Sequence, residues 1–191
     1  MRKITSNRPL LVLAIEEEAQ YLDTSLPVLL TGMGKVNAAT ALAVTLSGLP
    51  LPSAVVNLGT AGALRRGWAG THVIGRVIQH DLDSGTLRAL TGKNYGQPLT
   101  VGCNLDGPVL ATGDTFINSE ATRSRLAALA PLVDMEGYAL AVAAHGAKVP
   151  MHIVKHVSDD AGEGAAKIWQ ETVTECARAL ATWAARNIPT Y

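Results

Sequence analysis

Cysteine, aromatic residues and clustered basic residues are all scarce in this chain of 191 residues. The two cysteines, Cys103 and Cys176, lie far apart, and neither CxxC nor HxxxH spacing occurs. These absences argue against a structural zinc site and a disulfide framework, so we expect a protein of the reducing cytoplasm with no metal. The formal net charge is zero, and the adjacent basic pairs are Arg2-Lys3 and Arg65-Arg66. A nucleic-acid partner needs a clustered basic face, which this sequence lacks.

A long run suited to crossing a membrane is absent as well. Residues 36–64 carry no charge, but Gly48, Pro50 and Pro52 interrupt them, which favours helix, turn and strand over a membrane span. The apolar run at residues 9–15 is short and ends in three glutamates, so it does not indicate a signal peptide. We therefore expect no membrane partner. The length suits one well-buried domain, taken as residues 1–191.

Apolar runs rich in β-branched residues alternate with longer alanine-rich stretches. The apolar runs predict strands at residues 10–15, 28–31, 54–58, 72–80, 109–112, 132–135 and 151–157. The alanine-rich stretches predict helices at residues 35–47, 118–130, 137–147 and 165–186. This alternation predicts an α/β fold, a three-layer αβα sandwich around a central mixed sheet that is largely parallel. Residues 83–107 show no clear periodicity, so we expect an irregular loop with a functional role there.

Polar residues or glycines follow four of these apolar runs. The four segments are Glu16-Glu17-Glu18, Asn57-Leu58-Gly59-Thr60-Ala61-Gly62, Asp134-Met135-Glu136-Gly137 and Ser158-Asp159-Asp160. Ligands of open α/β sheets bind beyond the strand ends where such segments converge, so the four segments predict one pocket. A carboxyl group at the end of a buried strand is costly when it is charged and unpaired, so Asp159 is a candidate acid.

Local structure gives a simpler explanation for some of these carboxylates. The three glutamates at residues 16–18 can stabilise a helix N-terminus, and at most one or two of them can face a pocket. Asp160 and Glu163 have the spacing of a capping box, which predicts Asp160 as the N-cap of the last helix. Asp159 has no such local task, and a functional role is therefore favoured for it.

Other residues leave more than one interpretation open. Asp134 and Glu136 share one side of their strand, so one of them can merely support the other. His80 and Asp81 are adjacent, and neighbouring strand residues point to opposite faces, so a structural hydrogen bond is favoured over a catalytic dyad. Phe116, the only phenylalanine, fits either the core or a ring-stacking platform.

Taken together, these segments resemble the purine nucleoside phosphorylase/nucleosidase superfamily and, within it, the 5′-methylthioadenosine/S-adenosylhomocysteine nucleosidases. The resembling segments are residues 14–19, 32–36, 57–64, 95–97, 111–118, 133–137 and 154–161. They extend over most of the chain, and their order and spacing together are more specific than any one of them. The resemblance implies cleavage of the N-glycosidic bond between ribose and a purine, through a ribosyl-cation-like transition state and without a cofactor.

The resemblance also implies the two catalytic residues. Glu18 matches the glutamate that orients and deprotonates the attacking water. Asp159 matches the aspartate that donates a proton to purine N7, with Ser158 beside it as an orienting partner. An aspartate of ordinary pKa, about 3.9, can act as this acid only if its site raises the pKa. Burial at a strand end is expected to do so by desolvation.

Further residues are implied to bind the substrate. Met135 and Glu136 match the pair at the ribose, where the methionine packs on the sugar and the glutamate binds the 2′- and 3′-hydroxyls. Phe116 and Ile117 match residues at the purine, one stacking its ring and the other reading the purine edge with its backbone. The segment Thr60-Ala61-Gly62 is expected to border the same substrate.

Two positions favour water over phosphate as the nucleophile. Phosphorylases of this superfamily hold phosphate with arginines, which are expected where this chain has Asn57 and the glutamates at residues 16–18. An amide and carboxylates disfavour phosphate, so the sequence predicts hydrolysis. The chain is shorter than the usual nucleosidase and departs from it at Ile15, Asp134 and Gly137-Tyr138, but these departures leave the catalytic pair in place.

We therefore expect a cytoplasmic homodimer that hydrolyses the N-glycosidic bond of adenine nucleosides of the methylthioadenosine/S-adenosylhomocysteine type and releases adenine. The enzyme alternatives are a futalosine-type N-ribosidase and a purine nucleoside phosphorylase. The alternative of another class is a purine-nucleoside binding protein that has lost turnover. That alternative predicts a missing catalytic carboxylate, and none is missing.

Overall fold

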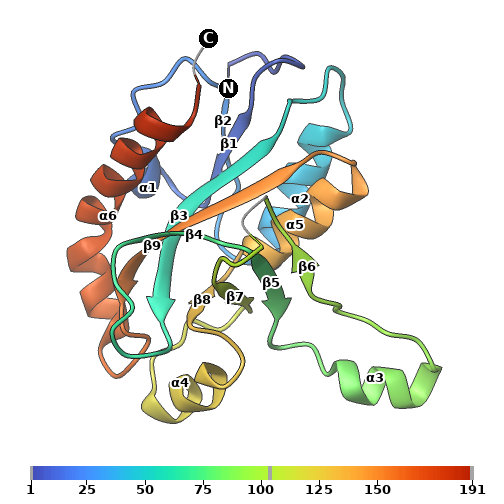
Figure 1. The fold of residues 1–191 in the computed structure, drawn as a ribbon, viewed down its shortest axis with the longest axis vertical. Helices are drawn as coiled ribbons and strands as arrows, with labels where there is room; N and C mark the ends of the chain where they lie inside the picture. Colours follow the sequence, from blue (N-terminus) through green and yellow to red (C-terminus); the bar gives the residue numbers. More distant parts are fainter. Residues whose placement is uncertain (1, 103–104, 190–191) are drawn as a thin grey trace.

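The computed structural model describes residues 2–102 and 105–189, so Cys103 lies outside the described residues. Strands and helices alternate along them (Figure 1). The strands are β1 (Leu10–Leu13), β2 (Val28–Leu30), β3 (Val55–Ala63), β4 (Thr71–Val73), β5 (Arg76–Gln79), β6 (Leu99–Thr100), β7 (Val109–Thr112), β8 (Leu132–Asp134) and β9 (Met151–Asp159). The helices are α1 (Glu16–Ala19), α2 (Lys35–Leu46), α3 (Ser84–Thr91), α4 (Glu120–Ala127), α5 (Gly137–Gly146) and α6 (Ala165–Asn187). Within these two stretches, no helix has the length and apolar character needed to cross a membrane.

The strands form one mixed sheet with β3 at its centre. β3 pairs in parallel with β1 and β9, and its last two residues pair antiparallel with β8. The pairs β1–β2, β5–β7 and β7–β8 are also parallel, whereas β4–β9 and β5–β6 are antiparallel. The sheet is therefore mixed and largely parallel, as the sequence predicted.

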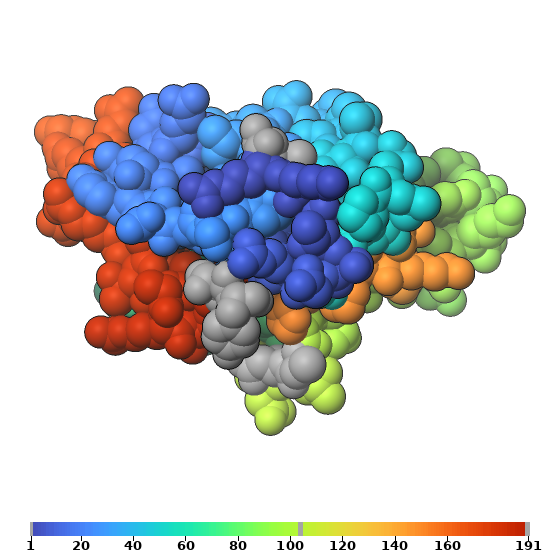
Figure 2. Space-filling model, turned by 90° about the horizontal axis from the view of Figure 1, so that it is seen from above, coloured from blue at the N-terminus to red at the C-terminus, as the bar shows by residue number. Residues whose placement is uncertain are grey.

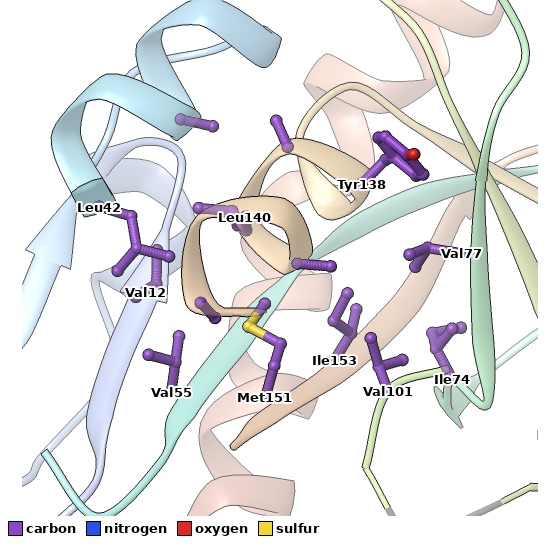
Figure 3. Close-up of a cluster of buried hydrophobic side chains, with 14 of the residues drawn as sticks. Val12, Leu42, Val55, Ile74, Val77, Val101, Tyr138, Leu140, Met151 and Ile153 are labelled. Atoms are coloured by element: carbon purple, nitrogen blue, oxygen red, sulfur yellow. The ribbon is translucent and has the colours of Figure 1, made fainter. Parts of the chain in front are cut away.

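Helices cover both faces of the sheet (Figure 1). α2 and α5 pack together on one face, and α1 and α6 pack together on the other. Val12 of β1 packs in one cluster with Leu42 of α2 and Leu140 of α5 (Figure 3). Its neighbour Leu13 belongs to the other cluster, with Leu180 of α6. A strand buried on both faces carries a continuous apolar run rather than an alternating one, and the predicted three-layer αβα arrangement is confirmed.

Most strands end within two residues of their predicted bounds, but two of the predicted strands differ more from the structure. The strand expected at residues 54–58 continues as β3 to Ala63, through Gly59 and Gly62, because β9 pairs with it along almost its whole length. The strand expected at residues 72–80 is divided into β4 and β5. Ile74 donates its N–H to the carbonyl of Ile153 in β9, whereas Gly75 donates to Pro108, just before β7. The chain therefore changes its partner strand between these two residues.

The region expected to be an irregular loop contains α3 and β6, so that prediction was wrong. Asp83 caps α3, since its Oδ1 accepts the N–H of Thr86 at 3.0 Å, and Gly92 ends the helix in the left-handed conformation with φ of +68°. All residues of α3 are at least partly exposed, so no core face imposes a strong pattern on its sequence. α3 projects from the side of the molecule away from α6 (Figures 1 and 2).

Candidate active site

A pocket of about 280 Å³ opens where the ends of β1, β3, β8 and β9 meet the segment after β7 and the start of α6. The structure brings together at this pocket all ten site residues that the sequence analysis selected. They are Glu18, Thr60, Ala61, Gly62, Phe116, Ile117, Met135, Glu136, Ser158 and Asp159. The four polar segments therefore converge on one cavity, as the strand-end argument predicted.

Glu18 is the one glutamate of α1 that faces the pocket. Its Oε2 accepts the N–H of Ala14 at 3.2 Å, and its Oε1 accepts the N–H and the hydroxyl of Thr60 at 2.7 and 2.9 Å. These three donors fix the orientation of a carboxylate that is only 5% exposed. Glu16 and Glu17 are exposed on the same short helix, which agrees with the expectation that at most two of the three could face the pocket.

A buried lysine that the sequence analysis missed lies beneath the pocket. Lys155 in β9 is 1% exposed, and its Nζ lies 2.9 Å from Asp134 Oδ2. Gly59 leaves room for it, since a Cβ there would lie 2.9 Å from Lys155 Nζ and 3.3 Å from Glu18 Oε1. Burial lowers the pKa of Lys155, but the surrounding carboxylates, chiefly Asp134, outweigh burial and raise that pKa. A lysine inside an apolar run was the available signal, because a charge in a buried strand needs a partner.

Asp134 lines the pocket and anchors the turn between β8 and α5. Its Oδ1 accepts the hydroxyl of Thr112 at 2.6 Å, and its Oδ2 accepts the N–H of Gly137 at 2.8 Å, at the start of α5. Glu136 lines the pocket, and its Oε1 accepts the N–H of Gly34 at 2.9 Å. Burial raises the pKa of Glu136 to about 7, and the negative charge of Asp134 acts in the same direction. Glu136 therefore changes charge near neutral pH.

Asp159 ends β9 and is not among the carboxyl groups that act on Lys155. The Ser158 hydroxyl donates to its Oδ2 at 2.7 Å, and the N–H of Ala161 donates to its Oδ1 at 2.8 Å. Desolvation outweighs these hydrogen bonds and raises the pKa of Asp159, as the sequence analysis expected. The β3–β9 register shifts between Ala61 and Gly62, and this bulge lets the adjacent residues 158 and 159 both line the pocket.

The capping role predicted for Asp160 was wrong. α6 begins only at Ala165, and Gly164 is its N-cap with φ of +83°. Asp160 is exposed, and its Oδ1 accepts the N–H of Gly162 at 3.2 Å within the preceding turn. Ala161 also adopts a left-handed conformation, with φ of +51°, so a turn of several residues separates the strand from the helix. Asp160 thus has a local structural role, although not as a helix cap.

The segment after β7 forms another wall of the pocket. Phe116 lines the pocket and is 40% exposed, so the structure removes the interpretation of Phe116 as a core residue. Ile117 beside it is buried. Ser119 is the N-cap of α4, and its hydroxyl oxygen accepts the N–H of Thr122 at 3.4 Å. The position of α4 therefore fixes the far end of this segment.

Helix α6 contributes residues that the sequence analysis did not select. Ala166, Trp169 and Gln170 line the pocket, and the Trp169 indole N–H donates to the Thr60 hydroxyl at 3.1 Å. Met33, before α2, lines it as well. A long amphipathic helix carries no local signal for which turn meets a pocket, and so the sequence alone did not identify these residues.

Three other residues considered in the sequence lie outside the pocket lining. Asn57 is buried in the middle of β3, where its Nδ2 donates to the carbonyl of Val12 at 3.0 Å. Asp81 makes a structural contact with Lys35 Nζ at 2.6 Å, whereas His80 Nε2 is buried without a hydrogen-bond partner among the described residues. The expected structural hydrogen bond is therefore present for Asp81 only. Within the described part of the chain, no group of three or more His, Cys, Asp or Glu residues is arranged to hold a metal ion.

The three-layer fold and the pocket place the chain among α/β proteins with a small-molecule site at the carboxyl edge of the sheet. The sequence profile of the phosphorylase superfamily matches residues 20–104 and 104–188. The chain belongs to this family.

Two proteins of similar sequence are nucleosidases. The 5′-methylthioadenosine/S-adenosylhomocysteine nucleosidase of Bacillus subtilis is 30% identical over 172 residues, which cover 75% of this chain and 72% of the relative. The nucleosidase of the same name from Staphylococcus carnosus is 28% identical, covering 92% of this chain and 87% of the relative.

Solved structures of the same fold include two kinds of hydrolase. A 5′-methylthioadenosine/S-adenosylhomocysteine nucleosidase from S. pneumoniae, bound to the transition-state inhibitor MT-ImmA, has a TM-score of 0.77 at 25% identity and covers 91% of this chain and 95% of its own. A futalosine hydrolase mutant from Helicobacter pylori has a TM-score of 0.83 at 18% identity, with coverage of 95% and 97%. The second likeness establishes the fold alone.

Proposed function

We propose that this chain hydrolyses the N-glycosidic bond of adenine nucleosides of the methylthioadenosine/S-adenosylhomocysteine type and releases adenine. The observation that carries the proposal is a pair of buried carboxyl groups in one pocket. Asp159 has a raised pKa, and Glu18 is held by three hydrogen-bond donors. The relatives named as nucleosidases for these substrates support the substrate class.

Asp159 is the proposed general acid. As the bond between ribose C1′ and purine N9 breaks, its electron pair passes to the purine, and a proton from Asp159 to N7 neutralises the leaving base. The raised pKa of Asp159 supports this role, because the group can then hold a proton nearer to neutral pH. The Ser158 hydroxyl, 2.7 Å from Asp159 Oδ2, is the proposed orienting partner.

Glu18 is the proposed general base. Its carboxylate takes a proton from water as the water oxygen bonds to C1′, which yields adenine and the free sugar. Glu136 is proposed to accept hydrogen bonds from the 2′- and 3′-hydroxyls, and Met135 to pack on the sugar. Phe116 is proposed to stack on the purine, and the backbone at Ile117 to read its edge. Segment 60–62, which also lines the pocket, is proposed to border the substrate.

The pocket lining supports water rather than phosphate as the nucleophile. Among the described residues that line the pocket, none is Lys or Arg. Lys155 lies beneath them and is paired with Asp134. A phosphate dianion would therefore meet the carboxyl groups of Glu18, Glu136 and Asp159 without a free cation to hold it.

An assay of adenine release from methylthioadenosine, with and without added phosphate, tests the proposed reaction. We expect release without phosphate and a free sugar as the second product. Strict dependence on phosphate, with ribose 1-phosphate formed, would contradict hydrolysis. Binding of the nucleoside without release of adenine under either condition would favour the binding-protein alternative.

The Glu18→Gln variant tests the proposed base. Loss of general-base catalysis is expected to lower kcat by roughly 10²–10⁴-fold. Adenine affinity should change little, because the amide keeps the size of the side chain. Glu17→Gln is the matched control, since Glu17 is exposed on the same helix. Full activity of Glu18→Gln would show that this role belongs to another residue.

We further propose that the chain acts as a cytoplasmic homodimer, as one domain of residues 1–191 and without a cofactor. Val36 and Val44 on α2 are 75% and 68% exposed, and Val142 on the contacting helix α5 is 48% exposed. Large aliphatic side chains exposed on two packed helices support burial against a second copy. Analytical ultracentrifugation is expected to give the dimer mass, and a monomer at micromolar concentration would contradict the homodimer.

A further inference from the structure

Three charged residues outside the pocket connect two of its walls. Lys35 begins α2, Asp81 follows β5 and Asp114 follows β7, and we call these three residues the Lys35 cluster. Lys35 Nζ lies 2.6 Å from Asp81 Oδ1 and 3.5 Å from Asp114 Oδ2. The cluster therefore joins three segments that are distant in the sequence.

Two consecutive backbone N–H groups at the start of α2 reach both of these walls. Gly34 donates to Glu136 Oε1 at 2.9 Å, and Lys35 donates to Asp114 Oδ1 at 2.8 Å. A helix N-terminus favours both negative charges. Gly34 is the N-cap, with φ of +89°, and a Cβ there would lie 3.3 Å from Asp114 Oδ1. The close approach of Asp114 thus depends on a glycine at this position.

The cluster also holds the start of the segment that carries Phe116 and Ile117. The N–H of Asp114 donates to Asp81 Oδ2 at 2.9 Å. Gly113, one residue earlier, packs against the ring of His80, which a Cβ at Gly113 would overlap. The segment 113–117 is therefore fixed at its first two residues, and the pocket-lining residues follow directly.

We propose that the Lys35 cluster positions segment 113–117 for purine binding, so that Lys35 is a positioning residue for the base. This inference rests on the proposed function. The Lys35 ammonium lies between two carboxylates, and without it Asp81 and Asp114 would repel each other across their shared contact. The side chains of Asp81 and Asp114 are 26% and 50% exposed, so solvent screens part of this repulsion. The segment would then move away from the wall that contains Glu136.

Kinetics and adenine binding of Lys35→Met test the proposal. We expect the KM for methylthioadenosine and the Kd for free adenine to rise by about ten-fold, while kcat changes by no more than about two-fold. Lys35→Arg, which keeps the charge, should restore most of the affinity. Asp81→Asn should raise both constants, and the double variant Lys35→Met/Asp81→Asn should fall short of the product of the two single effects, because both changes act on one contact.

Lys167→Met is the matched control, because it removes an exposed lysine that lies 3.8 Å from Glu171. Its KM and adenine affinity should equal those of the unmodified chain. Unchanged KM and adenine affinity in Lys35→Met would overturn the proposal, and so would a drop in kcat equal to the rise in KM. If Lys35→Met does not fold, Asp81→Asn decides the same question, since it removes one charge and keeps one of the two accepting oxygens. Adenine binding needs no turnover, so the Kd for adenine can be compared between variants even if the chain does not cleave the nucleoside. Binding of adenine without cleavage of the nucleoside would contradict the proposed function alone.

Discussion

The buried carboxyl groups of the pocket lie in two different electrostatic surroundings. On one side, which we call the Lys155 side, Glu18, Asp134 and Glu136 surround a buried ammonium group. On the Asp159 side, the carboxyl group receives hydrogen bonds from a hydroxyl and a backbone N–H, and no cation among the described residues acts on its pKa. The Lys155 charge opposes the effect of burial on the pKa of Glu136, although burial prevails, whereas no cation among the described neighbours of Asp159 opposes its burial.

The difference matches the two tasks that glycosidic hydrolysis needs. A base must be ionised to accept a proton from water, and an acid must be protonated to donate one. Different surroundings can therefore suit two carboxyl groups to these two tasks without any difference in side-chain chemistry. A substitution on the Asp159 side should therefore lower turnover, whereas a substitution on the Lys155 side should first lower stability.

The largest effect is expected for Asp159→Asn, which keeps the shape of the side chain and removes the proton. The loss of a general acid should lower kcat by roughly 10²–10⁴-fold. Asp160→Asn is the control, because Asp160 is exposed, accepts the N–H of Gly162 within the turn and influences Asp159 only through its charge. Steady-state rates of adenine release from both variants would settle the assignment. Near-normal turnover of Asp159→Asn, or a large loss in Asp160→Asn, would mean that the acid is misassigned.

On the Lys155 side, the corresponding change should act on stability first. Lys155→Met leaves Asp134 buried without its cation, and breaking such a pair costs about 3–5 kcal/mol. Urea unfolding would measure this loss of free energy of unfolding. The double variant Lys155→Met/Asp134→Leu should recover part of the loss, because the Asp134 charge is then no longer left unpaired. A single variant as stable as the unmodified chain would show that the cluster is not held together by Lys155.

Glu136 should give the Lys155 side a distinct pH dependence. Its pKa is about 7 in the folded chain and near 4.5 when unfolded, so the folded state holds its proton more tightly. The stabilisation is then complete below about pH 4.5 and is lost as the pH rises through about 7, which amounts to roughly 3 kcal/mol. Urea unfolding of the unmodified chain and of Glu136→Gln at several pH values isolates this contribution, since the other groups cancel in the difference. A difference that does not vary with pH would contradict the raised pKa.

The fold could be predicted from the sequence because burial dictates the pattern of apolar residues. β1 and β9 are covered on both faces, which requires the apolar runs that predicted them. α3 was missed because all of its residues are at least partly exposed, so packing places little demand on them. The division between β4 and β5 was also missed, because a change of partner strand leaves no mark on the periodicity of either strand.

Part of the pocket could be predicted from the sequence for the same reason. Polar residues directly after buried strands stood out against apolar runs, and they now line one cavity. Lys155 was missed because its partner Asp134 lies on another strand, β8. The strand β3 lies between β8 and β9 and pairs with both of them. Trp169 was missed because its contact with Thr60 joins residues far apart in the sequence. Contacts of this kind depend on the assembled sheet and are not encoded in local spacing.

The smallest effect that we predict concerns the purine itself and tests the Asp159 side. A carboxyl group at this position can protonate N7 and also accept a hydrogen bond from the 6-amino group of adenine, whereas a 6-oxo group would set one acceptor against another. An unpaired buried polar group costs about 1–3 kcal/mol. The kcat/KM for methylthioadenosine should therefore exceed that for its 6-oxo counterpart by roughly 10–100-fold.

The matched variant for this comparison is Asp159→Asn, whose amide can donate a hydrogen bond to a 6-oxo group. Its residual kcat/KM should show a smaller preference for the 6-amino purine, even though both rates are low. The backbone at Ile117 also borders the pocket and could read the same purine edge, in which case the preference would survive in the variant. Equal kcat/KM values for the two substrates in the unmodified chain, or a preference for the oxo form, would remove the adenine assignment. That outcome would favour a futalosine-type substrate, while the contrast between the two sides of the pocket would still explain the acid and the base.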